Sequence, residues 1–266
     1  MKLFYRKYGH GPVLIILHGL FGSSDNWTGI AKKLENRFTV ILPDQRNHGQ
    51  SPHSEVHDYE AMGNDLHELV TDLSIDKFFL AGHSMGGKTA MAFAIRWPEM
   101  LLGLLVADIS PFKGDDTVGS EHSYHARILK AILALDLTII SSREEAESEL
   151  LKSGFPPKIN GFILKNLRRV EGNRFEWKLN APSLLKNLEN IMKPMEKNPS
   201  WSGRVTGFPV IFLRGSESDY LPSSDYPAIH EIFPAAEFME IPGAGHWVHA
   251  DNPDAVVKSI NMFLES

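Results

Sequence analysis

Short apolar runs alternate with longer amphipathic segments along the first 111 residues of the chain. The run Val13-Leu14-Ile15-Ile16-Leu17 is continuously apolar, as expected for a strand that is buried on both faces of a parallel sheet. Residues 59–73 instead place apolar side chains near the spacing of one helical face. This alternation predicts an α/β fold, with a mostly parallel central sheet and helices on both of its faces.

The same pattern of apolar runs and amphipathic segments predicts the order of elements. A strand that begins at Phe78 leads into a sharp turn at Ser84. The other predicted strands cover residues 3–8, 13–17, 38–42, 101–106, 209–213 and 237–241. The predicted helices of this α/β part cover residues 25–35, 59–73, 88–96, 223–233 and 253–263, with Asp25 as a possible cap of the first.

The α/β pattern is interrupted between residues 112 and 206, where helical periodicity replaces the strands. Helices are expected there at residues 121–135, 142–152, 157–169 and 182–192, with turns at Gly172-Asn173 and at 199–203. We therefore expect an α/β core made of residues 1–111 and 207–266 and a helical cap made of residues 112–206.

Composition narrows the classes of function. With 27 Lys and Arg against 33 Asp and Glu, the net charge of −6 offers no basic surface for nucleic acid or for an anionic membrane. The absence of cysteine excludes disulfides and a thiolate nucleophile. No segment reaches the about 18 apolar residues of a membrane span. These features predict a cytoplasmic monomer or homodimer without nucleic-acid partners or stable membrane association.

The turn after the fourth strand carries the sequence Gly82-His83-Ser84-Met85-Gly86, a G-x-S-x-G pattern between a strand and a helix. In this setting the two glycines remove Cβ atoms that would collide across the turn, and the serine hydroxyl is held above the end of the strand. Ser84 is the expected nucleophile. The Met85 N–H, at the start of the next helix, is an expected donor to an oxyanion.

A serine nucleophile needs a base and an acid that orients the base. His246 lies in a glycine-flanked loop after the last strand, and the order serine, acid, histidine is the one used with this motif. Asp108 and Asp219 both follow strands and could be the acid; we favour Asp108, because Asp219 stands one residue late in its loop. The other carboxylate would then brace its loop, and Ser218 could bond to the histidine–acid pair.

The second oxyanion donor is expected in the loop His18-Gly19-Leu20-Phe21-Gly22, which follows the second strand. We expect the Leu20 N–H to donate, with the Phe21 N–H as the second choice. His249 follows His246 by three residues, but no carboxylate stands at metal-ligand spacing with them, so no metal site is predicted.

Taken together, these motifs resemble the α/β-hydrolase superfamily, and the resemblance covers nearly the whole chain. The strings Arg46-Asn47-His48-Gly49-Gln50-Ser51 and Gly82-His83-Ser84-Met85-Gly86-Gly87-Lys88 are similar to those of the YbfF/ABHD11-type esterases. The resemblance implies a carboxylesterase without cofactors that has a small helical cap. It also implies short- to medium-chain acyl esters as substrates, acyl-CoA thioesters among the possibilities, and it favours Asp108 as the acid.

Four residues are expected to contact the substrate: Phe21 beside the oxyanion loop, Arg46, and Tyr124 and Trp177 in the cap. Arg46 could meet an anionic group of the substrate, or it could form an ion pair that braces its own loop. Tyr124 and Trp177, with Ile128, Phe155 and Phe162, could line an acyl pocket, or they could form the core of the cap.

The sequence is compatible with three functional hypotheses. The first is ester hydrolysis through an acyl-enzyme on Ser84. The second keeps the same three residues for a perhydrolase or a C–C bond hydrolase. The third is a hydrolase fold that only binds a ligand, which an intact serine, histidine and acid argue against. Dehalogenase and epoxide hydrolase chemistry would need an aspartate in place of Ser84.

Overall fold

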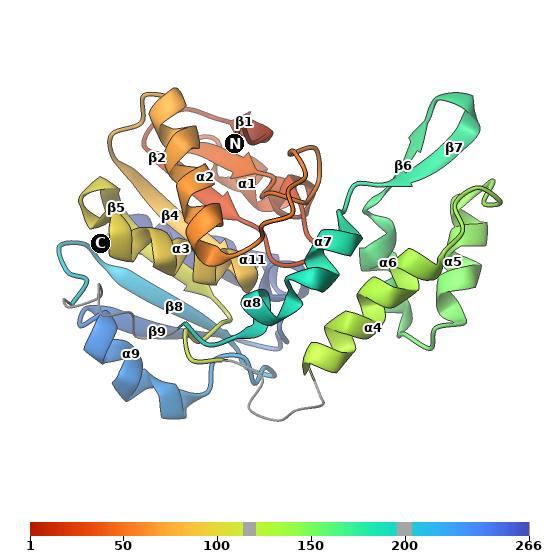
Figure 1. The fold of residues 1–266 in the computed structure, drawn as a ribbon. Coiled ribbons are helices and arrows are strands. Elements are labelled where there is room, and N and C mark those ends of the chain that lie inside the picture. Colours follow the sequence, from red (N-terminus) through yellow and green to blue (C-terminus); the bar gives the residue numbers. More distant parts are fainter. Residues whose placement is uncertain (114–120, 196–203, 266) are drawn as a thin grey trace.

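A seven-stranded sheet organises the chain in the computed structural model, which describes residues 1–113, 121–195 and 204–265 (Figure 1). The strands lie in the order β1-β3-β2-β4-β5-β8-β9. Only β1 runs antiparallel to its neighbour, so the predicted mostly parallel α/β sheet is confirmed. The strand bounds are β1 Tyr5–Tyr8, β2 Val13–Leu17, β3 Thr39–Pro43, β4 Phe78–His83, β5 Leu101–Ala107, β8 Val210–Gly215 and β9 Ala236–Ile241.

Helices cover both faces of this sheet because successive strand residues point to opposite sides. In β2, Ile15 and Leu17 pack on one side, while Leu14 and Ile16 pack on the other. The first side is covered by α2 (Tyr59–Asp72), α3 (Met85–Arg96) and α9 (Tyr226–Ile232). The second is covered by α1 (Thr28–Leu34) and α11 (Pro253–Glu265).

The first predicted helix begins differently from the expectation. A 3₁₀ turn, Ser24–Trp27, precedes α1, and the N–H of Ser23 donates to Asn26 Oδ1 at 2.7 Å. Asp25 therefore lies within the first turn, where it pairs with Arg6, and does not cap the helix. The loop after β9 also contains a short helix that the sequence did not predict, α10 (Val248–Asp251).

The segment between β5 and β8 forms a separate group of elements to one side of the sheet (Figure 1). Its apolar side chains make a third cluster that includes Leu129, Ile163 and Leu184. The elements are α4 (Glu121–Ala134), α5 (Arg143–Leu151), α6 (Pro157–Leu164), β6 (Leu167–Val170), β7 (Arg174–Trp177), α7 (Ala181–Lys186) and α8 (Leu188–Met192). This group corresponds to the expected cap, whose limits at residues 112 and 206 stay a prediction.

Two of the cap helices differ from the sequence prediction. The helix expected over residues 157–169 ends at Leu164, and residues 167–177 form an antiparallel hairpin around Gly172, whose φ is 74°. In β7, burial alternates as in a strand, with Phe175 buried between the exposed Arg174 and Glu176. The helix expected over residues 182–192 is divided at Asn187 into α7 and α8. The turn expected at residues 199–203 lies outside the described residues.

The two chain crossings between the core and the cap are held together beside α3. Lys88 is buried, and its Nζ donates to the carbonyl oxygens of Lys113, at 2.6 Å, and Lys193, at 2.8 Å. The N–H of Met195 also donates to the carbonyl of Pro111 at 2.8 Å. Lys88 therefore links the outgoing and the returning segment to the helix that begins at Ser84.

Candidate active site

Ser84 lies at a sharp turn between β4 and α3, with φ of 54° and ψ of −120°. This strained backbone is tolerated because both flanking glycines lack a side chain. A Cβ on Gly86 would come within 2.5 Å of the carbonyl oxygen of Leu17, and one on Gly82 would collide with the carbonyl of Gly86. The turn thus presents the Ser84 hydroxyl at the carboxyl edge of the sheet.

A continuous chain of hydrogen bonds runs from Ser84 to Asp108. His246 Nε2 lies 2.9 Å from Ser84 Oγ, and His246 Nδ1 lies 2.8 Å from Asp108 Oδ2. Since a carboxylate only accepts, Nδ1 carries the proton and Nε2 faces the serine hydroxyl as an acceptor. This is the tautomer that a general base needs.

Asp108 is fully buried at the end of β5, with a positive φ of 51°. Its Oδ1 accepts a hydrogen bond of 2.8 Å from the N–H of Gly215, and its Oδ2 also accepts from the Ser218 hydroxyl. Asp219, the alternative acid, is exposed, and His246 Nδ1 bonds to Asp108 instead. The geometry therefore favours Asp108, and it puts Ser218 where the sequence suggested, on the histidine–acid pair.

The oxyanion loop is fixed by hydrogen bonds to Phe21, whose φ is 62°. Its N–H donates to His48 Nε2 at 3.3 Å, and its carbonyl accepts from Asn166 Nδ2, from the cap, at 2.8 Å. In the described part of the chain the N–H of Leu20 has no acceptor, and that of Met85 is at the first position of α3, where no intrahelical acceptor exists. Leu20 and Met85 are therefore the available pair of donors.

Buried histidines support this arrangement in their neutral form. Burial lowers the pKa of His48 and of His83 well below the usual range. His48 Nδ1 donates to the carbonyl of Arg46 at 2.9 Å, which leaves Nε2 free to accept from Phe21. His83 Nε2 donates to the carbonyl of His246 at 2.7 Å and so fixes the main chain of the expected base. The bond from His83 to the main chain of His246 was not predicted from the sequence.

Comparison with known proteins agrees with this geometry. The family model described as the alpha/beta hydrolase fold matches residues 12–134. The sn-1-specific diacylglycerol lipase ABHD11 of Danio rerio is 40% identical over 263 residues, covering 97% of this chain and 80% of the relative. This chain is an α/β hydrolase of the YbfF/ABHD11-like esterases. Esterase YbfF of Escherichia coli K12 is 34% identical over 258 residues, covering 97% of this chain and 94% of that protein.

A solved structure is similar to the whole of this esterase. The structure titled "Marine microorganism esterase" has a TM-score of 0.93 and 42% sequence identity, and the match covers 98% of this chain and 99% of that one. Family and relatives together identify the enzyme as a carboxylic ester hydrolase that acts on small-molecule esters.

Two cavities open on Ser84, one of about 260 Å³ and one of about 30 Å³. The larger lies between the oxyanion loop, α4 and α6 of the cap, and the loop that carries His246. Phe21 and Tyr124, two of the four expected substrate contacts, line this cavity. Several other residues that line this cavity were not predicted to do so: His125, Lys158, Trp247 and Asp251.

Tyr220 lines both cavities and stacks on the imidazole of His246, with ring centroids 3.6 Å apart and an interplanar angle of 18°. The stack adds contact area to the ring and restrains its rotation. The sequence prediction stopped at the neighbouring Ser218 and Asp219 and did not single out this tyrosine.

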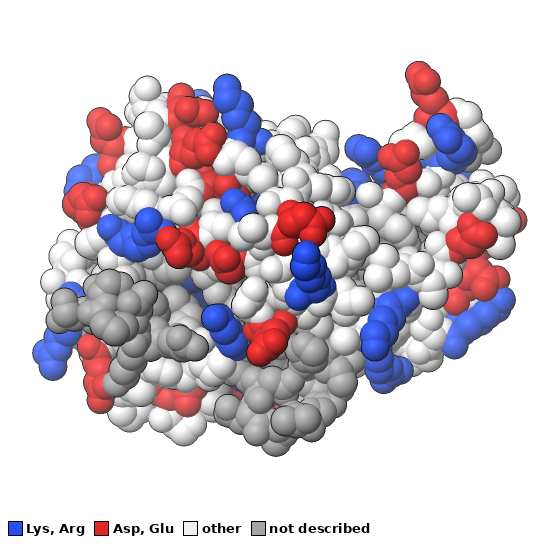
Figure 2. All heavy atoms as spheres, viewed as in Figure 1, with Lys and Arg blue, Asp and Glu red and all other residues white. Residues whose placement is uncertain are grey.

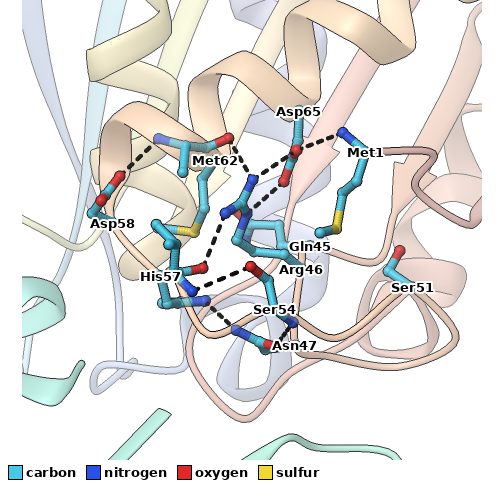
Figure 3. Close-up of polar contacts among 12 residues, drawn as sticks. Met1, Gln45, Arg46, Asn47, Ser51, Ser54, His57, Asp58, Met62 and Asp65 are labelled. Carbon is cyan, nitrogen blue, oxygen red and sulfur yellow. Dashed lines mark hydrogen bonds and ion pairs between the residues drawn. The ribbon is translucent and has the colours of Figure 1, made fainter. Parts of the chain in front are cut away.

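The expectation that Arg46 contacts the substrate is wrong, and its alternative, an ion pair that braces its own loop, is what the structure has (Figure 3). The buried guanidinium bonds to both carboxylate oxygens of Asp65, at 2.6 and 2.8 Å, and donates to the carbonyls of Val56 and Ala61. This network anchors to α2 the loop that carries His48.

Trp177 also lies away from both cavities, contrary to the expectation that it lines the acyl pocket. It belongs to the β6–β7 hairpin and packs against the apolar cluster of the cap. Its neighbour in that expectation, Phe155, is likewise part of the cap cluster, while Phe162 and Ile128 do line the larger cavity.

The remaining observations concern membrane spans, metal sites and surface charge. Among the described residues, none of the helices combines the length and apolar character needed to cross a bilayer, and no three His, Cys, Asp or Glu side chains gather as a metal site would require. On the face shown in Figure 2, acidic and basic side chains are interspersed, and no continuous basic surface is visible.

Proposed function

We propose that this esterase hydrolyses short- to medium-chain acyl esters through a covalent acyl-enzyme on Ser84, with His246 as general base and Asp108 as the acid of the triad. The observation that carries the proposal is the unbroken hydrogen-bond chain Ser84–His246–Asp108 next to two available N–H donors. A hydroxyl in this arrangement can be deprotonated as it attacks an acyl carbon.

In the first half of the reaction, Ser84 Oγ attacks the carbonyl carbon while its proton moves to His246 Nε2. The carbonyl oxygen becomes negative and is stabilised by the N–H groups of Leu20 and Met85, which are held in place before the reaction begins. His246 then gives the proton to the leaving oxygen, and the alcohol departs. Asp108 stabilises the imidazolium that exists between these two transfers.

In the second half, a water molecule takes the place of the alcohol. His246 accepts a proton from the water as it attacks the acyl-enzyme, and the acid leaves after the proton returns to Ser84 Oγ. Both halves use the same oxyanion site. Removal of any residue of the triad is therefore expected to slow both acylation and deacylation.

Acyl-CoA thioesters and diacylglycerol are narrower candidates for the substrate. A thioester carbonyl can be attacked by the same serine, and the relative from Danio rerio is named a diacylglycerol lipase. A perhydrolase or a C–C bond hydrolase would use the same triad, and a protein that only binds ligands would leave Ser84 unreactive.

The test is hydrolysis of p-nitrophenyl butyrate by the wild-type enzyme and by Ser84→Ala. Turnover should fall to the background of the protein-free reaction in the variant, because the hydroxyl that forms the acyl-enzyme is gone. Retained turnover in a folded Ser84→Ala would assign the nucleophile elsewhere. No turnover by the wild-type enzyme with any ester would favour the binding protein.

A further inference from the structure

The two cavities at Ser84 differ in size and in the catalytic groups that line them. Four residues line both: Leu20, Ser84, His125 and Tyr220. His246 lines only the larger cavity, of about 260 Å³, and Met85 lines only the smaller one, of about 30 Å³. The ester carbon that Ser84 attacks therefore lies where the two cavities meet, with His246 on the side of the larger cavity.

The position of the base determines which part of the ester lies on each side. His246 Nε2 must deliver its proton to the leaving oxygen, so that oxygen has to come within hydrogen-bonding distance of the imidazole. The carbonyl oxygen is turned toward the N–H groups of Leu20 and Met85. The alcohol therefore extends into the cavity lined by His246, and the acyl chain is directed into the other one.

We infer that the smaller cavity is the acyl site of this enzyme and that it limits the acyl group to a short chain, whereas the larger cavity accepts a bulky alcohol. One water-sized group needs roughly 10–15 Å³ measured in this way. The smaller cavity, at about 30 Å³, then holds two or three carbons beyond the carbonyl. The preferred acyl groups run from acetyl to butyryl. This inference rests on the proposed function and narrows it.

One wall of the smaller cavity, at the end of α8, is braced by hydrogen bonds. The hydroxyl of Tyr59 donates to the carbonyl of Ile191 at 2.6 Å, and Lys88 Nζ donates to the carbonyl of Lys193 at 2.8 Å. These bonds fasten the end of α8 to α2 and α3 of the core. Met192, half-buried at the last position of α8, is the flexible side chain of this wall.

The larger cavity has a different boundary, where α6 meets the loop of His246. Phe162 packs on Trp247 with centroids 4.8 Å apart, and Lys158 Nζ lies 2.6 Å from Asp251. The Lys158 side chain is 61% exposed, so this side of the cavity ends at the surface and leaves room for a large leaving group.

Two series of esters test the inference through kcat/KM, which reports the steps up to acylation. In the first series the alcohol is p-nitrophenol and the acyl group runs from acetate through butyrate and octanoate to dodecanoate. In the second the acyl group is butyrate and the alcohol grows from p-nitrophenol to 1-naphthol and 4-methylumbelliferone. We expect a loss of at least about tenfold between butyrate and octanoate, and a change below about threefold across the alcohols.

Variants of the two walls make the assignment specific. Met192→Ala enlarges the smaller cavity and should raise the octanoate-to-butyrate ratio of kcat/KM by about tenfold. Ile159→Ala is the matched control, since Ile159 is also half-buried and lines only the larger cavity. Ile159→Ala should change the order of preference among the alcohols and leave the octanoate-to-butyrate ratio of kcat/KM as in the wild type.

The inference is overturned if the octanoate-to-butyrate ratio of kcat/KM rises in Ile159→Ala and not in Met192→Ala. It is also overturned if the wild-type enzyme prefers dodecanoate. If Met192→Ala fails to fold, the two wild-type series still decide. Failure of the proposed function looks different, because then no ester in either series is hydrolysed at Ser84.

Discussion

At the scale of single residues, the site depends on how firmly Asp108 is held. Its carboxylate is fully buried and accepts hydrogen bonds from His246, Gly215 and Ser218. A buried carboxylate needs such donors, because the cost of removing it from water is otherwise uncompensated. The three bonds fix its position, and through it the position of the imidazole.

Replacement of Asp108 by Asn should lower kcat for p-nitrophenyl butyrate by about 10⁴-fold, because an amide at this position stabilises the wrong tautomer of His246. Asp219→Asn is the matched control and should keep near wild-type turnover, since its side chain is exposed. Steady-state kinetics on both variants, with circular dichroism to confirm folding, is the measurement. A large loss in Asp219→Asn with little in Asp108→Asn would reverse the assignment.

The sequence alone could single out Ser84 and His246 as the proposed nucleophile and base, because their loops carry strong local patterns. The choice between Asp108 and Asp219 depended on which strand end reaches the imidazole, and that is set by the order of β5, β8 and β9 in the sheet. The partner of Arg46 in the expected ion pair could not be identified, because Asp65 lies 19 residues away on another element. No pattern distinguishes Tyr220 from any tyrosine in a loop.

At the scale of elements, Lys88 connects the cap to the core. Its ammonium group bonds to one carbonyl in each chain crossing, at Lys113 and Lys193. Hydrogen bonds from a charged donor are worth more than neutral ones, and a carbonyl that loses its donor in a buried place is costly. The link lies on α3, four residues after Ser84.

Lys88→Met should therefore destabilise the protein by about 1–3 kcal/mol, because two carbonyls lose their donor while the packing of the aliphatic stem is kept. Urea denaturation followed by tryptophan fluorescence gives the free energy of unfolding. The exposed Lys186, on α7, offers the control Lys186→Met, which should change that free energy little. Equal values for the two variants would show that Lys88 does not hold the crossings.

Sequence patterns predicted the elements of the core more accurately than those of the cap. Inner strands such as β2 (Val13–Leu17) were predicted closely because they are continuous apolar runs. The β6–β7 hairpin was missed because Leu167, Arg168 and Arg169 also fit the end of a helix, and only the pairing with residues 174–177 makes them a strand. The division of the expected helix into α7 and α8 at Asn187 was also missed, because the sequence around it fits a continuous helix.

At the scale of the whole molecule, a group of neutral buried histidines links stability to pH. Burial lowers the pKa of His57 and His249 to about 3 and also lowers those of three others: His18, His48 and His83. The unfolded chain binds protons at these positions near the usual pKa of about 6.5, while the folded state does not. The contribution of these neutral histidines to the free energy of unfolding is complete above about pH 6.5 and is lost as the pH falls toward 3.

Each histidine that stays neutral in the folded state costs about 1.4 kcal/mol of stability per pH unit below about pH 6. His57→Gln removes one of the five and should reduce the slope of the unfolding free energy between about pH 6 and pH 4 by that amount. Urea denaturation at a series of pH values measures both slopes. Identical slopes in the two proteins would mean that His57 is protonated in the folded state.

The fold class and the order of its elements followed from the sequence because alternating strands and helices leave few arrangements. A change in periodicity at residue 112 predicts the division into core and cap. The shape of the cavities was beyond prediction, since they are formed by side chains from α4, α6 and α8 that meet the core only after the chain has folded.

The most direct test of the account is the site of covalent reaction with a fluorophosphonate probe, located by peptide mass spectrometry. We predict a single adduct on Ser84, absent in Ser84→Ala and formed much more slowly in His246→Ala, which lacks the proton acceptor. An adduct on another residue, or no adduct in an enzyme that hydrolyses p-nitrophenyl butyrate, would contradict the account.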